Sequence, residues 1–294
     1  MKKKILLTGV SGFLGSHLAK ELLAAGYEVI ALKRKSSSLH RVESIVSKIK
    51  LIDIEALNFD KLFQDFGKID AIIHTATCYG RNNESVAEIF NANTEFPLRL
   101  LESGSRLGVE LFINTDTVLD KYLNIYALTK KQFLQWGKFF TKNKRICFVN
   151  VRLEHFYGPD DETSKFPTYI VNSCIRNVPE LKLTKGEQIR DFIYIDDVVS
   201  AYMALLENLG EVDDFFIEIE LGSGKSVSIR QFVEMAHQIS ESKTKLDFGA
   251  IPYREGEIMC SQANIARLIS LGWHCRYDLE AGLNKMIGIE RANI

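Results

Sequence analysis

A tyrosine and a lysine stand four residues apart, at Tyr126 and Lys130, in a stretch whose amphipathic pattern predicts a helix over residues 126–141. Residues four apart share a helix face, so the phenol and the ammonium group are expected side by side. An unperturbed phenol has a pKa of about 10 and needs a neighbouring cation to exchange a proton near neutrality. The pair therefore predicts a proton donor or acceptor, with Lys130 lowering the pKa of the phenol.

Hydroxyl side chains stand shortly before this helix, where a predicted strand over residues 110–114 leads into Asn114-Thr115-Asp116-Thr117. A hydroxyl at this place can polarise the same carbonyl group that the phenol protonates. Thr115 is the predicted catalytic hydroxyl. Thr117 is the alternative if the strand ends later than the sequence pattern indicates.

Glycines recur in Thr8-Gly9-Val10-Ser11-Gly12-Phe13-Leu14-Gly15, between a predicted strand at 4–8 and a predicted helix at 16–25. Glycines permit a tight turn there and let the amides at a helix N-terminus approach a pyrophosphate. The motif predicts a dinucleotide site. Its predicted cofactor-binding residues are Gly9, Ser11, Gly12, Phe13, Leu14 and Gly15.

The second predicted strand, 28–32, is followed by Lys33-Arg34-Lys35-Ser36-Ser37-Ser38. An acidic residue usually stands here when the ribose 2′-hydroxyl of NAD is bound, and an arginine when a 2′-phosphate is bound. Three cations and three hydroxyls without a carboxylate favour NADP(H) over NAD. Arg34 is the predicted phosphate ligand, because a guanidinium group binds phosphate in a bidentate manner.

Apolar strands at 4–8, 28–32, 69–74 and 110–114 alternate with amphipathic helical stretches. This alternation is typical of an α/β fold with a parallel sheet, and strands without polar alternation indicate helices on both faces. After about Val151 turn residues interrupt the rhythm. We predict a doubly wound Rossmann domain over 1–155 and a smaller C-terminal substrate-binding domain over 156–294, with part of 185–215 returning to the first domain.

The chain has 294 residues with 37 basic and 38 acidic side chains, which argues against nucleic acid as a partner. No apolar run approaches the roughly 20 residues of a membrane span, and the stretch after Lys2-Lys3-Lys4 is too short for a signal peptide. Five scattered cysteines predict neither a disulfide framework nor a metal site. A cytoplasmic protein that does not bind the membrane is expected.

Taken together, these motifs resemble the extended short-chain dehydrogenases/reductases, the NAD-dependent epimerase/dehydratase family, along nearly the whole chain. Besides the glycine loop, the matching segments include Asp53-Ile54, His74-Thr75-Ala76 and Asn91. Later matches are Arg152-Leu153-Glu154-His155-Phe156-Tyr157-Gly158-Pro159, Arg190-Asp191-Phe192-Ile193-Tyr194-Ile195-Asp196-Asp197, Arg254-Glu255-Gly256-Glu257 and Leu271-Gly272-Trp273.

The resemblance implies roles for individual residues. Thr115, Tyr126 and Lys130 would be catalytic, with Tyr126 and Lys130 also contacting the cofactor. Asp53, Ile54, Thr75 and Ala76 would line the cofactor. Arg190 and Arg254 would clamp a substrate diphosphate, unless they form salt bridges to Asp191 or Glu255. His155 would contact the substrate or be a wall residue. The family also implies a homodimer, formed through residues 91–107 and 126–141.

Departures from the family pattern discriminate between reactions. The dehydratases carry Thr-Asp-Glu where this chain has Thr115-Asp116-Thr117, so the base for dehydration is missing. The basic loop favours NADPH that enters as a reductant, whereas epimerases keep NAD bound. The expected reaction is reduction of the 4-keto group of a nucleotide-activated deoxyhexose, for surface-polysaccharide synthesis. The alternatives are a nucleotide-sugar epimerase, a 4,6-dehydratase, or a non-catalytic protein that senses NADP.

Overall fold

The computed structural model describes residues 2–55, 57–142, 145–208 and 214–293. The chain divides into two compact units. One comprises Met1–Arg152 and Tyr202–Ile219, and the other Leu153–Ala201 and Glu220–Ile294. The segment that rejoins the first unit overlaps the 185–215 stretch for which such a return is predicted.

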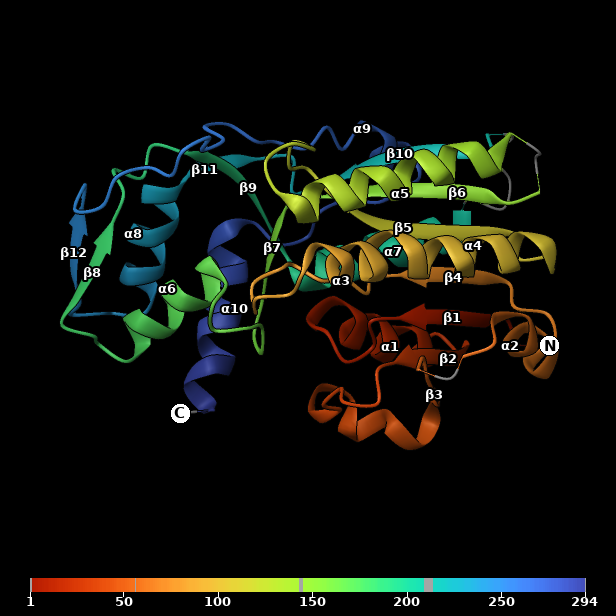
Figure 1. The fold of residues 1–294 in the computed structure, drawn as a ribbon. Coiled ribbons are helices and arrows are strands. Elements are labelled where there is room, and N and C mark those ends of the chain that lie inside the picture. Colours follow the sequence, from red (N-terminus) through yellow and green to blue (C-terminus); the bar gives the residue numbers. More distant parts are fainter. Residues whose placement is uncertain (1, 56, 143–144, 209–213, 294) are drawn as a thin grey trace. The chain divides into compact units, whose positions relative to one another are not determined.

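A seven-stranded parallel sheet forms the centre of the first unit (Figure 1). Its strand order is β10–β6–β5–β4–β1–β2–β3. The strands are β1 (Lys4–Thr8), β2 (Glu28–Lys33), β3 (Lys50–Asp53), β4 (Ala71–His74), β5 (Leu111–Thr117), β6 (Cys147–Leu153) and β10 (Phe216–Leu221). The strand order reverses between β1 and β4, which in doubly wound sheets is where a ligand binds, at the carboxyl ends of the strands. The predicted Rossmann fold is confirmed.

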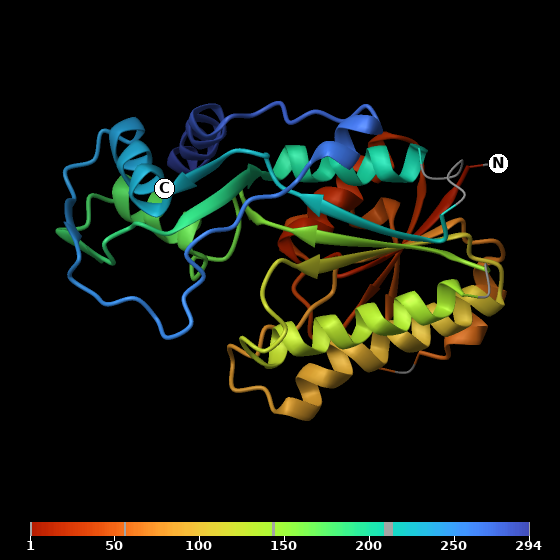
Figure 2. The same cartoon turned by 90° about the horizontal axis from the view of Figure 1, so that it is seen from above.

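Helices connect these strands. They are α1 (Phe13–Ala24), the 3₁₀ helix η1 (His40–Lys48), α2 (Phe59–Phe66), α3 (Val86–Phe90), the π-helical turn η2 (Asn91–Glu95), α4 (Phe96–Arg106), α5 (Ile125–Thr141) and α7 (Ile195–Asn208), whose second half belongs to the first unit. Helices α4 and α5 lie side by side along one face of the sheet (Figures 1 and 2).

An aromatic core fixes α5 against this face. Phe112 of β5 stacks on Phe148 of β6 at 5.5 Å between ring centroids, and Phe133 of α5 packs edge-on against Phe148 at 5.7 Å. Gly137 allows the close approach of the helix, because a Cβ there would lie 2.4 Å from the Phe148 ring. Offset and edge-on pairs of buried aromatic rings stabilise a core beyond their apolar area. The start of α5 is thereby held near the carboxyl ends of the strands.

The second unit contains two small sheets. Strands β7 (His155–Tyr157), β9 (Ile189–Tyr194) and β11 (Ser226–Ser228) form one, and β8 (Glu180–Leu183) pairs in parallel with β12 (Lys245–Phe248) in the other. Its further helices are α6 (Phe166–Ile175), α8 (Ile229–Ile239), α9 (Ala266–Ser270) and α10 (Leu279–Ala292).

A buried carboxylate ties the loops of this unit together. Asp191 is fully buried and accepts hydrogen bonds from the amides of Ser223 at 2.7 Å, Gly224 at 3.0 Å and Ala263 at 3.2 Å. Burial raises the pKa of Asp191, and these hydrogen bonds oppose the rise. The Arg-Asp-Phe segment is thus partly structural, because its aspartate organises two loops.

Within the described ranges, no helix is both long and apolar enough to span a membrane.

Candidate active site

In the glycine loop, two backbone segments lie too close together to leave room for side chains. Gly9 has a φ of +76°, and its carbonyl oxygen would lie 2.1 Å from a Cβ added at Gly15. The Gly12 amide donates to the Gly9 carbonyl at 2.9 Å, which closes the turn. Gly12 is also the N-cap of α1 and has no side chain with which to cap the first turn. Amides left in this state bind anions, so the loop fits a dinucleotide pyrophosphate.

Thr8 joins the ends of β1 and β4 beside this loop. Its hydroxyl oxygen accepts from the amides of Thr75 and Ala76, each at 3.2 Å, and hydrogen-bonds to His74 Nδ1 at 2.8 Å. The Thr75 hydroxyl donates back to the Thr8 carbonyl at 2.7 Å. Burial holds the pKa of His74 well below its usual value, so the imidazole is neutral. The strand ends that would line a cofactor are therefore rigidly connected.

The basic loop after β2 is only partly available to an anion. Lys33 forms an ion pair with Asp53, the residue predicted to hold the adenine. Arg34 and Lys35 have exposed side chains. A further arginine, Arg41 of η1, donates to the Ser11 carbonyl of the glycine loop at 3.3 Å. Sequence reasoning missed Arg41, whose signal was its place soon after the serine run.

Tyr126 lies in the first turn of α5, which begins after Asn124, an N-cap that accepts from the Ala127 amide at 2.8 Å. The Tyr126 ring packs on Tyr79 at 5.0 Å between centroids. Burial raises the pKa of Tyr126, with help from Tyr79 and Asp116, against a hydrogen bond from Thr117 and the charge of Arg81. The direction of this shift is opposite to the lowering that was predicted from Lys130. A phenol with a raised pKa keeps its proton at neutral pH.

Thr115 and Thr117 have different partners. The Thr115 hydroxyl is hydrogen-bonded to the hydroxyl of Tyr202 at 2.7 Å, whereas the Thr117 side chain lies close enough to Tyr126 to lower the pKa of the phenol. The Leu119 amide donates to Thr117 Oγ1 at 3.3 Å, which leaves the hydroxyl proton for Tyr126. Strand β5 runs to Thr117 and not to residue 114 as predicted, which is the case for which Thr117 was named as the alternative.

Lys130 follows Tyr126 by one helical turn and is almost fully buried. Burial lowers the pKa of Lys130 to about 8, while the charge of Asp116 acts in the opposite direction. At pH 7 a group with this pKa is protonated about nine times in ten. The structure thus places a cationic lysine and a protonated phenol on one helix face, as the Tyr126–Lys130 spacing predicts.

Arg190 and the segment around Arg254 meet within the second unit. Arg190 is buried and donates to Glu257 at 2.7 Å. The Glu257 amide donates to the Arg254 carbonyl at 3.1 Å, so residues 254–257 form a β-turn, and such a turn brings its end residues within about 7 Å. The partner of Arg190 is thus Glu257, and neither Asp191 nor Glu255. Arg254 is exposed at the other end of the same turn.

His155 is anchored by its neighbour in the chain. Its Nδ1 lies 3.4 Å from the buried carboxylate of Glu154, and Glu154 also accepts from the Ser261 hydroxyl at 2.5 Å. The His155 ring packs edge-on against Phe192 at 5.9 Å. The imidazole is therefore oriented, and 38% of its side chain remains accessible.

The family model described as "NAD dependent epimerase/dehydratase family" matches residues 5–217. The chain belongs to this family. A CDP-abequose synthase from Salmonella muenchen is 36% identical to it over 99% of both chains, and one from Salmonella typhimurium is 35% identical over 98% of both. The resemblance inferred from the motifs is confirmed, and the chain is an enzyme of a family that modifies nucleotide sugars.

Solved structures of epimerases are similar over the same length. The UDP-glucose 4-epimerase of Thermotoga maritima has a TM-score of 0.86 at 21% identity and covers 99% of both chains. The UDP-glucuronic acid 4-epimerase of Bacillus cereus, solved with UDP-glucuronic acid and NAD, has a TM-score of 0.84 at 25% identity and covers 99% of this chain and 100% of its own. These likenesses establish the fold of the family for the whole chain.

One family motif lies two residues from its predicted position. Asn91 is exposed, and the buried asparagine is Asn93 in the π-helical turn. Asn93 accepts from the Cys78 amide at 2.7 Å and donates to the Cys78 carbonyl at 2.8 Å and to Thr129 at 3.1 Å. Asn91, which was matched to the family pattern from the sequence, makes none of these contacts. Asn93 fixes the loop after β4 against α5, next to Tyr79 and Tyr126.

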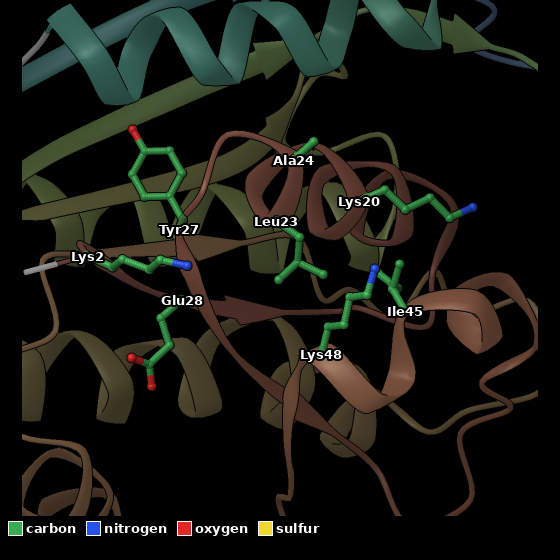
Figure 3. A pocket seen from close by; sticks show the side chains of 8 residues that line it. All are labelled: Lys2, Lys20, Leu23, Ala24, Tyr27, Glu28, Ile45 and Lys48. Carbon is green, nitrogen blue, oxygen red and sulfur yellow. The ribbon is translucent and has the colours of Figure 1, made fainter.

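A separate cavity of about 570 Å³ lies away from these residues. Figure 3 shows its lining, which comes from α1, η1, the start of β2 with the residue before it, and Lys2 before β1. Tyr27 and Glu28 stand at the start of β2, at the end of the strand opposite to the basic loop. The cavity is therefore not part of the candidate active site.

Proposed function

We propose that this enzyme reduces the 4-keto group of a nucleotide-activated deoxyhexose, with NADPH as the reductant. The observation that carries the proposal is the arrangement at the start of α5, where Tyr126 packs on Tyr79 one helical turn before the buried Lys130, with Thr117 at the end of β5 beside it. The CDP-abequose synthases at 35–36% identity support the substrate class. The product would serve surface-polysaccharide synthesis in the cytoplasm.

NADPH, when bound, supplies the hydride that adds to C4. The glycine loop and the first turn of α1 bind its pyrophosphate, Thr75 and Ala76 line it, and Lys130 holds its ribose. Asp53 and Ile54 lie at the adenine end, where Asp53 is already paired with Lys33. Arg34 binds the 2′-phosphate, because its exposed guanidinium group follows the end of β2.

Tyr126 donates the proton that the ketone oxygen needs as the alcohol forms. Its raised pKa suits this direction of reaction, since a donor must hold its proton until the oxygen becomes basic. The Thr117 hydroxyl hydrogen-bonds to Tyr126 and orients the carbonyl oxygen. Lys130, cationic at pH 7, stabilises the negative charge that passes to the phenol oxygen.

Arg190 and Arg254 bind the diphosphate of the substrate, and His155 contacts its sugar. The turn that links Arg254 to Glu257, the partner of Arg190, supports convergence of the two guanidinium groups. Two arginines match the negative charge of a nucleoside diphosphate well.

The enzyme acts as a homodimer. Helix α5, one of the two segments expected at the interface, carries the exposed rings of Phe139 at 55% and Trp136 at 44% exposure, whose centroids lie 6.2 Å apart. Exposed apolar side chains that lie together favour association.

A panel of nucleotide 4-keto-deoxysugars tests the proposal, with stoichiometric NADPH consumption and product formation as the readout. We expect one NADPH oxidised per sugar reduced. Interconversion of two sugars without net NADPH consumption would instead show an epimerase, and loss of water would show a dehydratase. NADP binding without turnover on the whole panel would leave a non-catalytic sensor. Comparable kcat/KM for a 4-keto sugar with and without its nucleoside diphosphate would overturn the substrate class.

A further inference from the structure

A buried carboxylate immediately precedes Thr117 in the chain. Asp116 is 3% exposed and stands on β5 between the two threonines. Its carboxylate accepts from Lys131 Nζ at 2.8 Å, from Asn150 Nδ2 at 2.9 Å and from the Thr117 amide at 2.7 Å. These contacts occupy both oxygens with groups of the protein. Asp116 is therefore not directed at a substrate in the way that the acid of a Thr-Asp-Glu triplet would be.

Lys131 contacts the backbone of Thr117 as well. Its ammonium group donates to the Thr117 carbonyl at 2.6 Å as well as to Asp116. Both polar groups of the Thr117 backbone are thus bound by one ion pair. The pairing of β5 with β4 ends at Asn114, so Thr117 lies beyond the part of the strand that β4 supports. At Thr117 the ion pair of Asp116 and Lys131 makes the backbone hydrogen bonds that β4 does not make.

A hydrogen bond from the neighbouring strand β6 holds the ion pair of Asp116 and Lys131 in place. Asn150 of β6, which donates to Asp116, accepts from Asn114 Nδ2 at 2.8 Å, and both asparagines are fully buried. Burying a carboxylate costs free energy unless it is paired with a cation and hydrogen-bonded, and Asp116 is both. Networks of this kind hold their members in one arrangement.

We infer that Asp116 and Lys131 are positioning residues for the proposed reduction, which fix the Thr117 backbone at the end of β5 and so place its hydroxyl beside the start of α5, without touching the substrate. The kinetic part of this inference rests on the proposed function. The positioning of Thr117 does not, and it can be measured separately.

The pair also acts on Lys130, and its two members act in opposite directions. The negative charge of Asp116 raises the pKa of Lys130, and the positive charge of Lys131 lowers it. The other titratable groups near Lys130 are Tyr126 on the same helix and His74 on β4, which is neutral. Replacing Asp116 should move the titration of Lys130 to lower pH, and replacing Lys131 should move it to higher pH.

The kinetic test compares Asp116→Asn and Lys131→Met with Lys138→Met, a control that removes an exposed lysine from the same helix. We expect kcat to fall about 10- to 100-fold in the first two variants, as is typical of small misplacements of a catalytic group. KM for the nucleotide sugar and affinity for NADPH should stay within about twofold, since neither residue contacts them. The alkaline limb of the kcat profile should shift in opposite directions in the two variants. The control should match the wild type.

Three results would overturn the inference: unchanged kcat in both variants, a loss confined to KM, or pH shifts in the same direction. Lys131→Met leaves Asp116 as an unpaired buried charge and can fold poorly. The double variant Asp116→Asn/Lys131→Met removes both charges, so it should regain the Tm of the wild type but not its kcat. Recovery of kcat along with Tm in the double variant would also count against positioning.

Threonine methyl NMR tests the positioning without any turnover. Thr117→Val assigns the Thr117 signal, and Thr115, held by Tyr202, is the internal reference. In Lys131→Met we expect the Thr117 methyl signal to move and the Thr115 signal to stay. An unmoved Thr117 signal refutes the inference. A moved signal together with no reduction of any 4-keto sugar by the wild type would leave the positioning intact and refute the proposed function alone.

Discussion

The Thr117 hydroxyl lies close enough to Tyr126 to lower the pKa of the phenol, although Thr117 ends β5 and Tyr126 stands in the first turn of α5. Residues 118–124 connect them. The strand end and the helix start therefore meet over a short connection, and the hydroxyl and the phenol can act on one carbonyl oxygen.

The two threonines of β5 provide a matched pair. Thr117→Val should lower kcat about 10- to 1,000-fold, because it removes a hydrogen-bond donor from the reacting oxygen. Thr115→Val loses the bond to Tyr202 and should mainly lower Tm. Steady-state kinetics and thermal unfolding of both variants check this. A larger kcat loss in Thr115→Val would restore Thr115 as the catalytic hydroxyl.

Tyr126→Phe should bind NADPH nearly as well as the wild type and lose most turnover. The ring still packs on Tyr79, and only the proton donor is missing. General acid catalysis is typically worth about 10²- to 10⁴-fold in rate. Cofactor titration by fluorescence and single-turnover reduction separate the two properties. Turnover within a few-fold of the wild type would show that another group donates the proton.

Arg34→Ala should weaken NADPH far more than NADH, because NADH lacks the 2′-phosphate. A hydrogen bond to a charged group contributes about 1.5–3 kcal/mol, so cofactor preference should shift about tenfold or more. Calorimetric binding of both cofactors measures it. Lys33→Ala is the control, since Lys33 is already paired with Asp53 and should alter the preference less. Equal losses for NADPH and NADH would remove Arg34 from the phosphate site.

Lys130→Met should be inactive yet more stable than the wild type at pH 7. The lowered pKa of Lys130 means that the unfolded chain binds this proton more readily than the folded chain between about pH 8 and 10.5. The folded protein thus carries the full penalty below pH 8 and gains stability as the pH rises through this window. Removing the buried charge should raise Tm by several degrees, or about 1–2 kcal/mol. Thermal unfolding without cofactor at pH 7 and pH 9.5 tests the sign, which a lower Tm at pH 7 would reverse.

Arg190→Ala and Arg254→Ala should each raise KM for the nucleotide sugar and leave NADPH affinity nearly unchanged. Because the two residues are linked through Glu257, the double variant should fall short of the sum of the single losses. A double-mutant cycle on kcat/KM measures the coupling. Fully additive losses would mean that the two guanidinium groups bind separate parts of the substrate.

Much of the fold could be predicted from the sequence, because apolar strands, glycine spacing and amphipathic helices are local signals. The parallel sheet followed from them, whereas the family and its nucleotide-sugar class followed from the resemblance of the ordered motifs; all of these are confirmed. That Tyr126 and Lys130 lie on one face could also be predicted from the sequence, because residues four apart in a helix share a face.

The partners of the site residues could not be predicted in the same way. The pairing of Lys33 with Asp53 depends on strand neighbours, and that of Asp116 with Lys131 depends on packing of α5 against β5. Thr115 and Thr117 have the same residue type and share a strand, so only the observed end of β5 separates their roles. The predicted fall in the pKa of Tyr126 was wrong in direction because burial, which no local pattern reveals, raises this pKa.

The π-helical turn at Asn91–Glu95 makes residue counting through this helix unreliable. Each residue of a regular α-helix advances the side chain by about 100°, so one residue gained or lost in the turn changes which side chains face the interior. Helix α3 and helix α4 can therefore keep their own packing while the chain between them varies in length. Relatives of this enzyme should tolerate single insertions or deletions here more readily than elsewhere in the helix. A sequence alignment anchored on α4 should therefore match the buried asparagine, whereas an alignment anchored on α3 should miss it.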